Sequence, residues 1–306
     1  MDNNIFFYLG NTPFFTGLRV LDGIFPLSHG ETCSIIGSFG SGRNSIIHSI
    51  SKNSNSDVFI YVCCGERGND LVEVLYDFPE ITLNIKDKHY SIMNKTCMVG
   101  NSSNMSIAAR EASIYTGITI AEYFRDMGYN VSMVADSTTR WAEALRELSG
   151  HMNEMPSEGG YPAYLTSRLA QFFERAGRVK CIGSPDREGS ISLFGTVSPY
   201  GWDFTDVVTR ATLSLTNAFW GLDRKLAQRK HFPCVNWTVS NCNEGNWKNF
   251  NNEFSEFNDF RVKIKNILYI EAELSETIQL IGKKSLTDEQ KLAIEVMKKT
   301  SLSEFY

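Results

Sequence analysis

Short apolar runs alternate with amphipathic stretches along the first 240 residues of the chain. The runs at 32–36, 58–64, 96–99 and 131–135 each end at a glycine or a polar residue. Apolar residues at helical spacing follow these runs. Repeated strand–helix units of this kind predict a mostly parallel sheet that helices cover on both faces. The pattern therefore predicts an α/β fold.

The pattern changes after residue 240. The next segment is rich in Asn, Glu and aromatic residues and is predicted to be a polar linker. Apolar residues then recur at helical spacing from Phe260 to Ile281, Gly282 is a candidate C-cap, and Thr287 and Gln290 match a capping box before a second helix. We expect four parts: a short N-terminal extension at 1–12, an α/β domain at 13–240, a linker at 241–257 and a small helical domain at 258–306.

Composition and charge narrow the class of protein. The 306 residues include 30 Lys and Arg against 35 Asp and Glu, which leaves a formal charge of -5 and argues against sequence-independent binding of nucleic acid. No stretch approaches the roughly 18–20 apolar residues that span a bilayer, and the N-terminus is a poor signal peptide. Seven cysteines without a CxxC pair favour inert core thiols in a reducing compartment.

The loop after the first predicted strand has the spacing of a phosphate-binding P-loop, GxxxxGK[ST]. In such a loop the backbone N–H groups at a helix N-terminus point at phosphate oxygens. Arg43 stands where the motif has Lys, and Asn44, a candidate magnesium ligand, stands where it has Ser or Thr. A purely structural strand-to-helix turn is an equal alternative. The candidate residues are Gly37, Ser38, Phe39, Gly40, Ser41, Gly42, Arg43, Asn44 and Ser45.

Two carboxylates follow two further predicted strands, at the strand ends where open α/β sheets hold ligands. Glu66 is a candidate for orienting an attacking water, with a surface salt bridge to Arg67 as the alternative. Asp136 has the place of a Walker B aspartate that holds a magnesium shell, or it caps the next helix. Arg140 is placed to reach a γ-phosphate or to pair with a surface acid. The P-loop, Glu66 and Asp136 each follow a different predicted strand. Their agreement favours a nucleotide site.

Longer segments closely resemble the catalytic A subunits of vacuolar-type rotary H+-ATPases. The likeness covers nearly the whole chain. It implies a RecA-like P-loop nucleotide-binding domain followed by a helical bundle, in agreement with the α/β pattern and the helical end. The most specific segments lie at 13–22, 64–69, 109–118, 135–147, 160–164 and 227–233.

The resemblance also implies roles for single residues, with ATP as the substrate and Mg²⁺ as the cofactor. Glu66 would position the attacking water, and Arg67 and Arg140 would help to hold the phosphates. Asp136 would serve the magnesium shell. Phe232 would lie against the adenine, although without the resemblance it would be expected in the core.

The resemblance further implies partners and a location. In the family, A subunits alternate with B subunits in a hexameric head, and ATP hydrolysis there turns a central stalk that drives proton transport through a separate membrane sector. We therefore expect B-type and stalk subunits as partners, besides ATP and ADP, and no direct nucleic acid contact. The chain would be cytoplasmic and peripheral on the cytoplasmic face of an endomembrane, without inserting into it.

Several positions depart from the family pattern. Besides Arg43 and Asn44, the chain has Tyr200 and Trp202 where the family has Pro and Gly, and Val207 where it has Pro. The family's N-terminal β-barrel and inserted domain have no counterpart, and the helical part is short. We expect a fragment or a divergent, shortened paralogue. A hydrolysing A-type subunit is the first hypothesis. The alternatives are a non-hydrolysing nucleotide-binding or regulatory paralogue and, against the charge, a RecA-type nucleic-acid motor.

Overall fold

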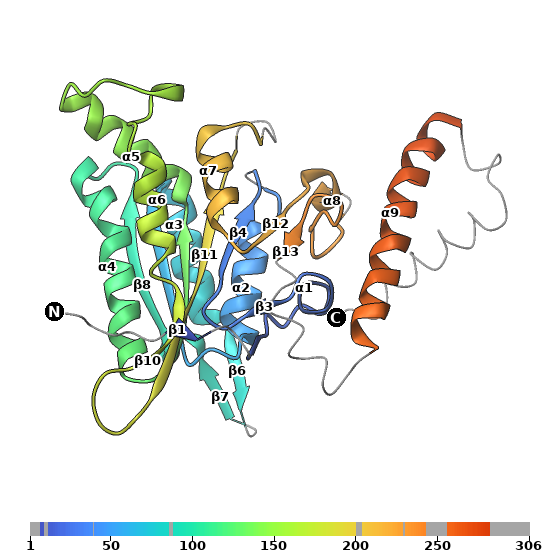
Figure 1. Ribbon diagram of the computed structural model, residues 1–306, viewed down its shortest axis with the longest axis horizontal. Helices are drawn as coiled ribbons and strands as arrows, with labels where there is room; N and C mark the ends of the chain where they lie inside the picture. The colour runs from blue at the N-terminus through green and yellow to red at the C-terminus, as the bar shows by residue number, and fades with distance from the viewer. Residues whose placement is uncertain are drawn as a thin grey trace.

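The computed structural model describes residues 7–8, 12–38, 40–85, 88–199, 204–228, 230–242 and 256–281. A twisted sheet runs through the centre of this part of the chain, with helices on both faces (Figure 1). Its strands lie in the order β13 (Asn241–Cys242), β12 (Ala218–Gly221), β4 (Thr32–Ile36), β11 (Glu188–Val197), β9 (Asn130–Asp136), β5 (Val58–Glu66) and β8 (Thr96–Ser102).

All neighbours from β12 to β8 are parallel, as the strand–helix alternation predicts. The antiparallel pairs lie at the margins, where β13 joins β12, and β10 (Gly177–Lys180) joins β11 and β1 (Phe7–Tyr8). The predicted extension at 1–12 thus contributes a short edge strand, because β1 pairs with the open side of β10. Two small antiparallel sheets of two strands lie outside this sheet: β2 (Pro13–Phe14) with β3 (Leu27–Ser28), and β6 (Thr82–Ile85) with β7 (Lys88–Ser91).

The helices form two layers, each with its own hydrophobic core. Strand β5 shows why its apolar run is unbroken. Phe59, Tyr61 and Cys63 face one core, and Ile60 and Val62 face the other. The first core takes α1 (Arg19–Ile24), α2 (Arg43–Asn53) and α3 (Gly68–Glu80); the second takes α4 (Ile107–Asp126), α5 (Thr138–His151), α6 (Leu165–Phe173) and α7 (Val207–Leu215).

The helical end of the chain begins with α9 (Phe257–Ile281), which includes the predicted run from Phe260 to Ile281. Arg261 donates its Nε–H to the carbonyl of Ile24, which joins α9 to the end of α1. The predicted C-cap and capping box lie outside the described residues, so the bounds of the helical domain stay a prediction. The remaining short helices are α8 (Arg224–Gln228), η1 (Ile92–Lys95) and η2 (Glu158–Gly160).

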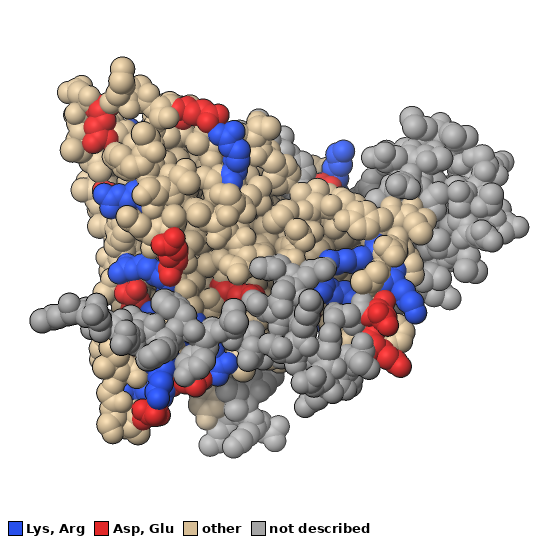
Figure 2. Space-filling model, viewed as in Figure 1, with Lys and Arg blue, Asp and Glu red and all other residues tan. Residues whose placement is uncertain are grey.

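Charged side chains of both signs are interspersed on the face of the molecule that Figure 2 displays. Lys and Arg alternate there with Asp and Glu, and no continuous basic stripe crosses the described part of that face. Among the helices that the structure describes, none combines the length and the apolar character that crossing a membrane requires.

Candidate nucleotide-binding site

The P-loop connects the end of β4 to the first residue of α2. Gly42 precedes the helix with a φ of +82°, a left-handed conformation that glycine adopts without strain. A Cβ atom on Gly42 would also lie only 3.1 Å from the Sγ atom of Cys234. The loop therefore depends on this glycine to direct the backbone into the N-terminus of α2. Phe39, a predicted member of the loop, lies outside the described residues.

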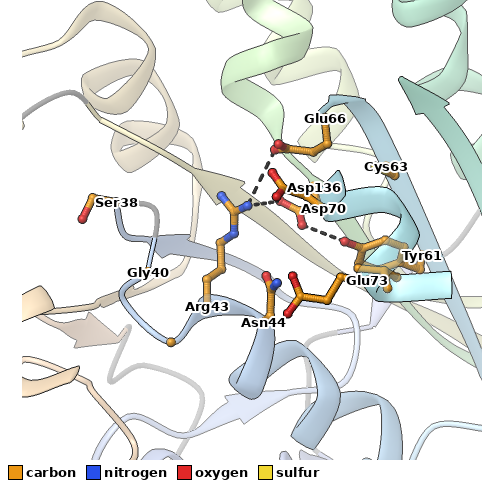
Figure 3. Close-up of a pocket in the computed structure, with 12 residues that line it drawn as sticks. Ser38, Gly40, Arg43, Asn44, Tyr61, Cys63, Glu66, Asp70, Glu73 and Asp136 are labelled. Atoms are coloured by element: carbon orange, nitrogen blue, oxygen red, sulfur yellow. Dashed lines mark hydrogen bonds and ion pairs between the residues drawn. The ribbon is translucent and has the colours of Figure 1, made fainter. Parts of the chain in front are cut away.

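Arg43 begins α2 and extends toward the ends of β5 and β9 (Figure 3). Its Nη2 atom lies 3.1 Å from Oδ1 of Asp136 and 3.6 Å from Oε1 of Glu66. Its Nη1 atom donates a 2.6 Å hydrogen bond to the hydroxyl of Ser198, just beyond β11. Burial alone would lower the pKa of Arg43, but the two carboxylates raise it. One arginine thus serves as the counter-ion of both predicted acidic residues.

Asp136 is almost completely buried at the end of β9, and other protein groups contact both of its oxygens. Oδ2 accepts a 2.7 Å hydrogen bond from the phenol of Tyr61, and Oδ1 accepts one of 2.8 Å from Thr196. Burial, together with the charge of Asp136, raises the pKa of Tyr61, so the phenol remains a neutral donor. The predicted alternative, in which Asp136 caps α5, is wrong because the Ser137 side chain caps that helix.

Glu66 ends β5 beside Arg43 and is also buried. Gly65, with a φ of +66°, produces the shift in register between β5 and β8 that sets the direction of this strand end. Burial and the nearby charge of Asp136 raise the pKa of Glu66, while Arg43 and Arg140 partly offset that rise. Glu66 is therefore a buried carboxyl group in a cleft, the environment in which general bases are tuned.

These side chains line a cleft of about 200 Å³ in front of the P-loop. Figure 3 shows Asp70 and Glu73 of α3 on the wall opposite the loop. The described lining residues are Ser38, Gly40, Gly42, Arg43, Asn44, Tyr61, Cys63, Glu66, Asp70, Glu73, Val74 and Asp136.

Other predicted site residues lie around this cleft. Ser45 is exposed on α2 and, together with Phe232, lines a second hollow of about 460 Å³ beside the same helix. Arg140 pairs with Glu143 at 2.8 Å, and its charge still reaches Glu66. Arg67 is exposed before α3 and does not line the cleft.

Several residues of the site were not predicted from the sequence, and four of them show why. Thr196 is the last residue but one of β11 and Ser198 lies just beyond it, and a place at the carboxyl end of a parallel strand is a signal that could have put both near the site. Tyr61 lies inside an apolar run, where nothing distinguishes a donor to Asp136 from a core aromatic residue. Asp70, on the first turn of α3, had no signal beyond its closeness to Glu66.

The predicted ligands of magnesium, Asp136 and Asn44, are not free to hold it together. Asn44 does line the cleft, but both oxygens of Asp136 already contact protein donors. No group of three or more His, Cys, Asp or Glu side chains in the described ranges is arranged to hold a metal ion. Magnesium requires close to ideal octahedral oxygen ligands. The side chains of the cleft do not fit a magnesium ion unless Arg43 moves away from Asp136.

Comparisons with known proteins identify two family domains in the chain. Residues 17–242 match the ATP synthase alpha/beta family, nucleotide-binding domain, and residues 247–301 match the C-terminal domain of V and A type ATP synthase. The catalytic A subunit of the V-type proton ATPase of Manduca sexta is 59% identical over 290 residues, which are 94% of this chain and 47% of that protein. For the same protein of Zea mays the identity is 57%, over 94% of this chain and 52% of the relative.

Solved structures show the same fold. An ATPase from the type III secretion system of pathogenic bacteria is 27% identical with a TM-score of 0.79, over 97% of this chain and 80% of that one. The assembled ATPase EscN of enteropathogenic E. coli has a TM-score of 0.80 at 27% identity. The match covers 95% of this chain and 66% of that one. The chain spans about half the length of the curated relatives it matches. By its nucleotide-binding domain, it belongs to the ATP synthase alpha/beta family.

Proposed function

We propose that the chain is an A-type, ATP-binding subunit in the head of a V-type rotary proton ATPase. The observation that carries this proposal is the meeting of the P-loop with Glu66 and Asp136 at one edge of the sheet, through Arg43. The similarity to V-type catalytic A subunits over 94% of the chain supports it. ATP would lie with its phosphates at the N-terminus of α2, where backbone N–H groups and the helix dipole favour negative charge.

The two hollows beside α2 suit the two ends of a nucleotide. The phosphates fit the cleft in front of Arg43 and Asn44. The adenosine fits the hollow beside Ser45 and Phe232, where an aromatic ring can lie against a base. Arg67 and Arg140 would contribute positive charge at the rim of the cleft, as the resemblance implies.

Hydrolysis needs a group that orients the attacking water and a cation that meets the charge on the phosphates. Glu66 would perform the first task, and its buried position at the end of β5 supports this role. A magnesium ion, held by Asp136 and Asn44, would supply positive charge to the phosphates. The prediction that Asp136 and Asn44 hold this ion requires Arg43 to leave Asp136.

A non-hydrolysing nucleotide-binding or regulatory subunit is the second candidate. One observation favours it: the same arginine engages Glu66, the candidate base, and Asp136, the candidate metal ligand. The nucleic-acid motor has less support, since the described charges on the face in Figure 2 are mixed in sign.

The proposed partners are B-type subunits that alternate with this chain in the head, and the central stalk inside it. The chain would then lie peripherally on the cytoplasmic side of an endomembrane. The match of residues 247–301 to the C-terminal domain of V and A type ATP synthase supports a place in such a head.

The test is ATP turnover by the full chain assembled with B-type subunits, compared with the double variant Arg43→Lys plus Asn44→Thr. Loss of one well-placed electrostatic group commonly costs about 10²–10³ in rate. We therefore expect the double variant to turn over faster by about that factor. Arg210→Lys, at an exposed arginine paired with Glu158, is the control and leaves the rate unchanged. Absence of ATP turnover and binding in both versions would contradict the proposal.

A further inference from the structure

One atom of Arg43 contacts both buried acids of the cleft. Its Nη2 lies within 3.6 Å of Glu66 and within 3.1 Å of Asp136, and the three side chains are each at most 12% exposed. A metal ion that bridged these two carboxylates would have to occupy the same place. The guanidinium group therefore excludes a cation that binds both acids at once.

The other ligands that magnesium would use are also engaged by protein groups or changed. Tyr61 and Thr196 donate hydrogen bonds to the two oxygens of Asp136. The side chain after Arg43 is the amide of Asn44, in place of the hydroxyl that the P-loop motif supplies to a magnesium ion. In this cleft Arg43 therefore lies where a bridging ion would lie, and an amide stands in place of the motif's hydroxyl.

A guanidinium group can perform the bridging task of the ion. It carries five N–H donors in a planar fork and remains charged when buried. Arg43 directs Nη2 at the carboxylates and Nη1 at Ser198, and the fork can share its donors with a phosphate oxygen at the mouth of the cleft. Arginine thereby joins carboxylate to phosphate, as a divalent cation does.

The remaining acids of the cleft do not reverse this charge balance. Glu73 is exposed and Asp70 is half-buried, so water screens their repulsion of a phosphate. Glu66 and Asp136 are buried, so water does not screen their negative charges. These are the two charges that Arg43 offsets. The N-terminus of α2 attracts phosphate independently of all four side chains.

We propose that Arg43 is the resident cation of this site, so that the chain binds nucleoside di- and triphosphates without a divalent metal ion. This inference rests on the proposed function, since it names how the same cleft holds its nucleotide. It gives Arg43 two roles. Arg43 contacts phosphate, and it also determines whether nucleotide binding depends on a metal ion.

The test is the affinity of the full chain for ATP and for ADP, measured by calorimetric titration with Mg²⁺ and with EDTA at matched ionic strength. We expect the two dissociation constants for each nucleotide to agree within about threefold, less than 1 kcal/mol. Binding that is more than about tenfold weaker in EDTA would overturn the inference and leave the proposed function intact. No binding in either buffer would overturn the proposed function itself.

The double variant Arg43→Lys plus Asn44→Thr tests whether these residues are the cause. The shorter lysine side chain leaves Asp136 free for a metal ion, and the threonine restores the hydroxyl of the motif. The variant should therefore bind ATP at least about tenfold more weakly in EDTA than in Mg²⁺. Metal independence retained in the variant would overturn the assignment to Arg43. The exposed control Arg210→Lys should behave as the unmodified chain does.

Discussion

The guanidinium of Arg43 lies 3.1 Å from the carboxylate of Asp136, so the first residue of α2 and the last residue of β9 form a buried ion pair. The same arginine approaches Glu66 at the end of β5. Three separate segments of the chain therefore depend on one positive charge. Because each segment also borders the candidate nucleotide cleft, the pair links the stability of the fold to the properties of the site.

Removal of the Arg43 charge should destabilise the protein strongly. The variant Arg43→Met leaves Asp136 without its counter-ion and Glu66 with only the smaller influence of Arg140, a change that commonly costs about 3–5 kcal/mol. We expect this loss in the free energy of unfolding measured with urea. Arg210→Met, which breaks an exposed pair with Glu158, is the matched control and should cost less than about 1 kcal/mol. If both substitutions lowered the free energy of unfolding equally, the buried pair would contribute no more to stability than the exposed one.

The buried His29 should make stability depend on pH. Burial, with a further contribution from Arg178, lowers the pKa of His29 from 6.5 to about 4. The unfolded chain therefore binds a proton before the folded chain does, and stability that is present above pH 6.5 is lost as the pH falls to about 4. The shift corresponds to about 3 kcal/mol.

The variant His29→Gln should flatten this part of the profile, measured as the midpoint of urea unfolding between pH 7 and pH 4. His151→Gln, at the exposed end of α5, is the control and should keep the slope of the unmodified chain. An unchanged slope in His29→Gln would mean that other groups cause the acid sensitivity.

Close packing between α4 and β5 should reject even one methyl group. A Cβ atom on Gly117 would collide with Cγ2 of Val62 and lie 3.2 Å from Cε of Met133. Gly117→Ala should therefore lower the free energy of unfolding by about 1–3 kcal/mol. Gly150→Ala has no heavy atom within 4 Å of the new group and should stabilise by up to about 1 kcal/mol. Stabilisation by both substitutions would contradict this close packing.

The sequence was sufficient to place Glu66 and Asp136 together, because the carboxyl ends of parallel strands meet at one edge of a sheet. The α/β class followed from the alternation of predicted strands and helices along the chain. The partners of Asp136 could not be predicted. Tyr61 has the same apolar surroundings as its neighbours in β5, and only the packed structure shows that its phenol turns toward β9.

The direction of Arg43 was also beyond the sequence. A P-loop cation is expected to point at phosphate, and spacing alone does not show that neighbouring strand ends supply two buried acids to a longer side chain. The edge strands β1 and β13 were missed because each has only two residues, too few for any periodic pattern. The roles of Arg67 and Phe232 stay predictions.

Nucleotide binding at the P-loop is the claim on which the proposed function most depends. Titration of a fluorescent ATP analogue into the full chain, followed by displacement with ATP, measures this directly. Gly42→Ala forces a side chain into a left-handed conformation that costs roughly 1–2 kcal/mol and lies against Cys234, so we expect affinity to fall about tenfold or more. Gly150→Ala should bind as the unmodified chain does. Saturable, displaceable binding that Gly42→Ala weakens is the predicted result; no binding, or equal binding by both variants, would contradict the claim.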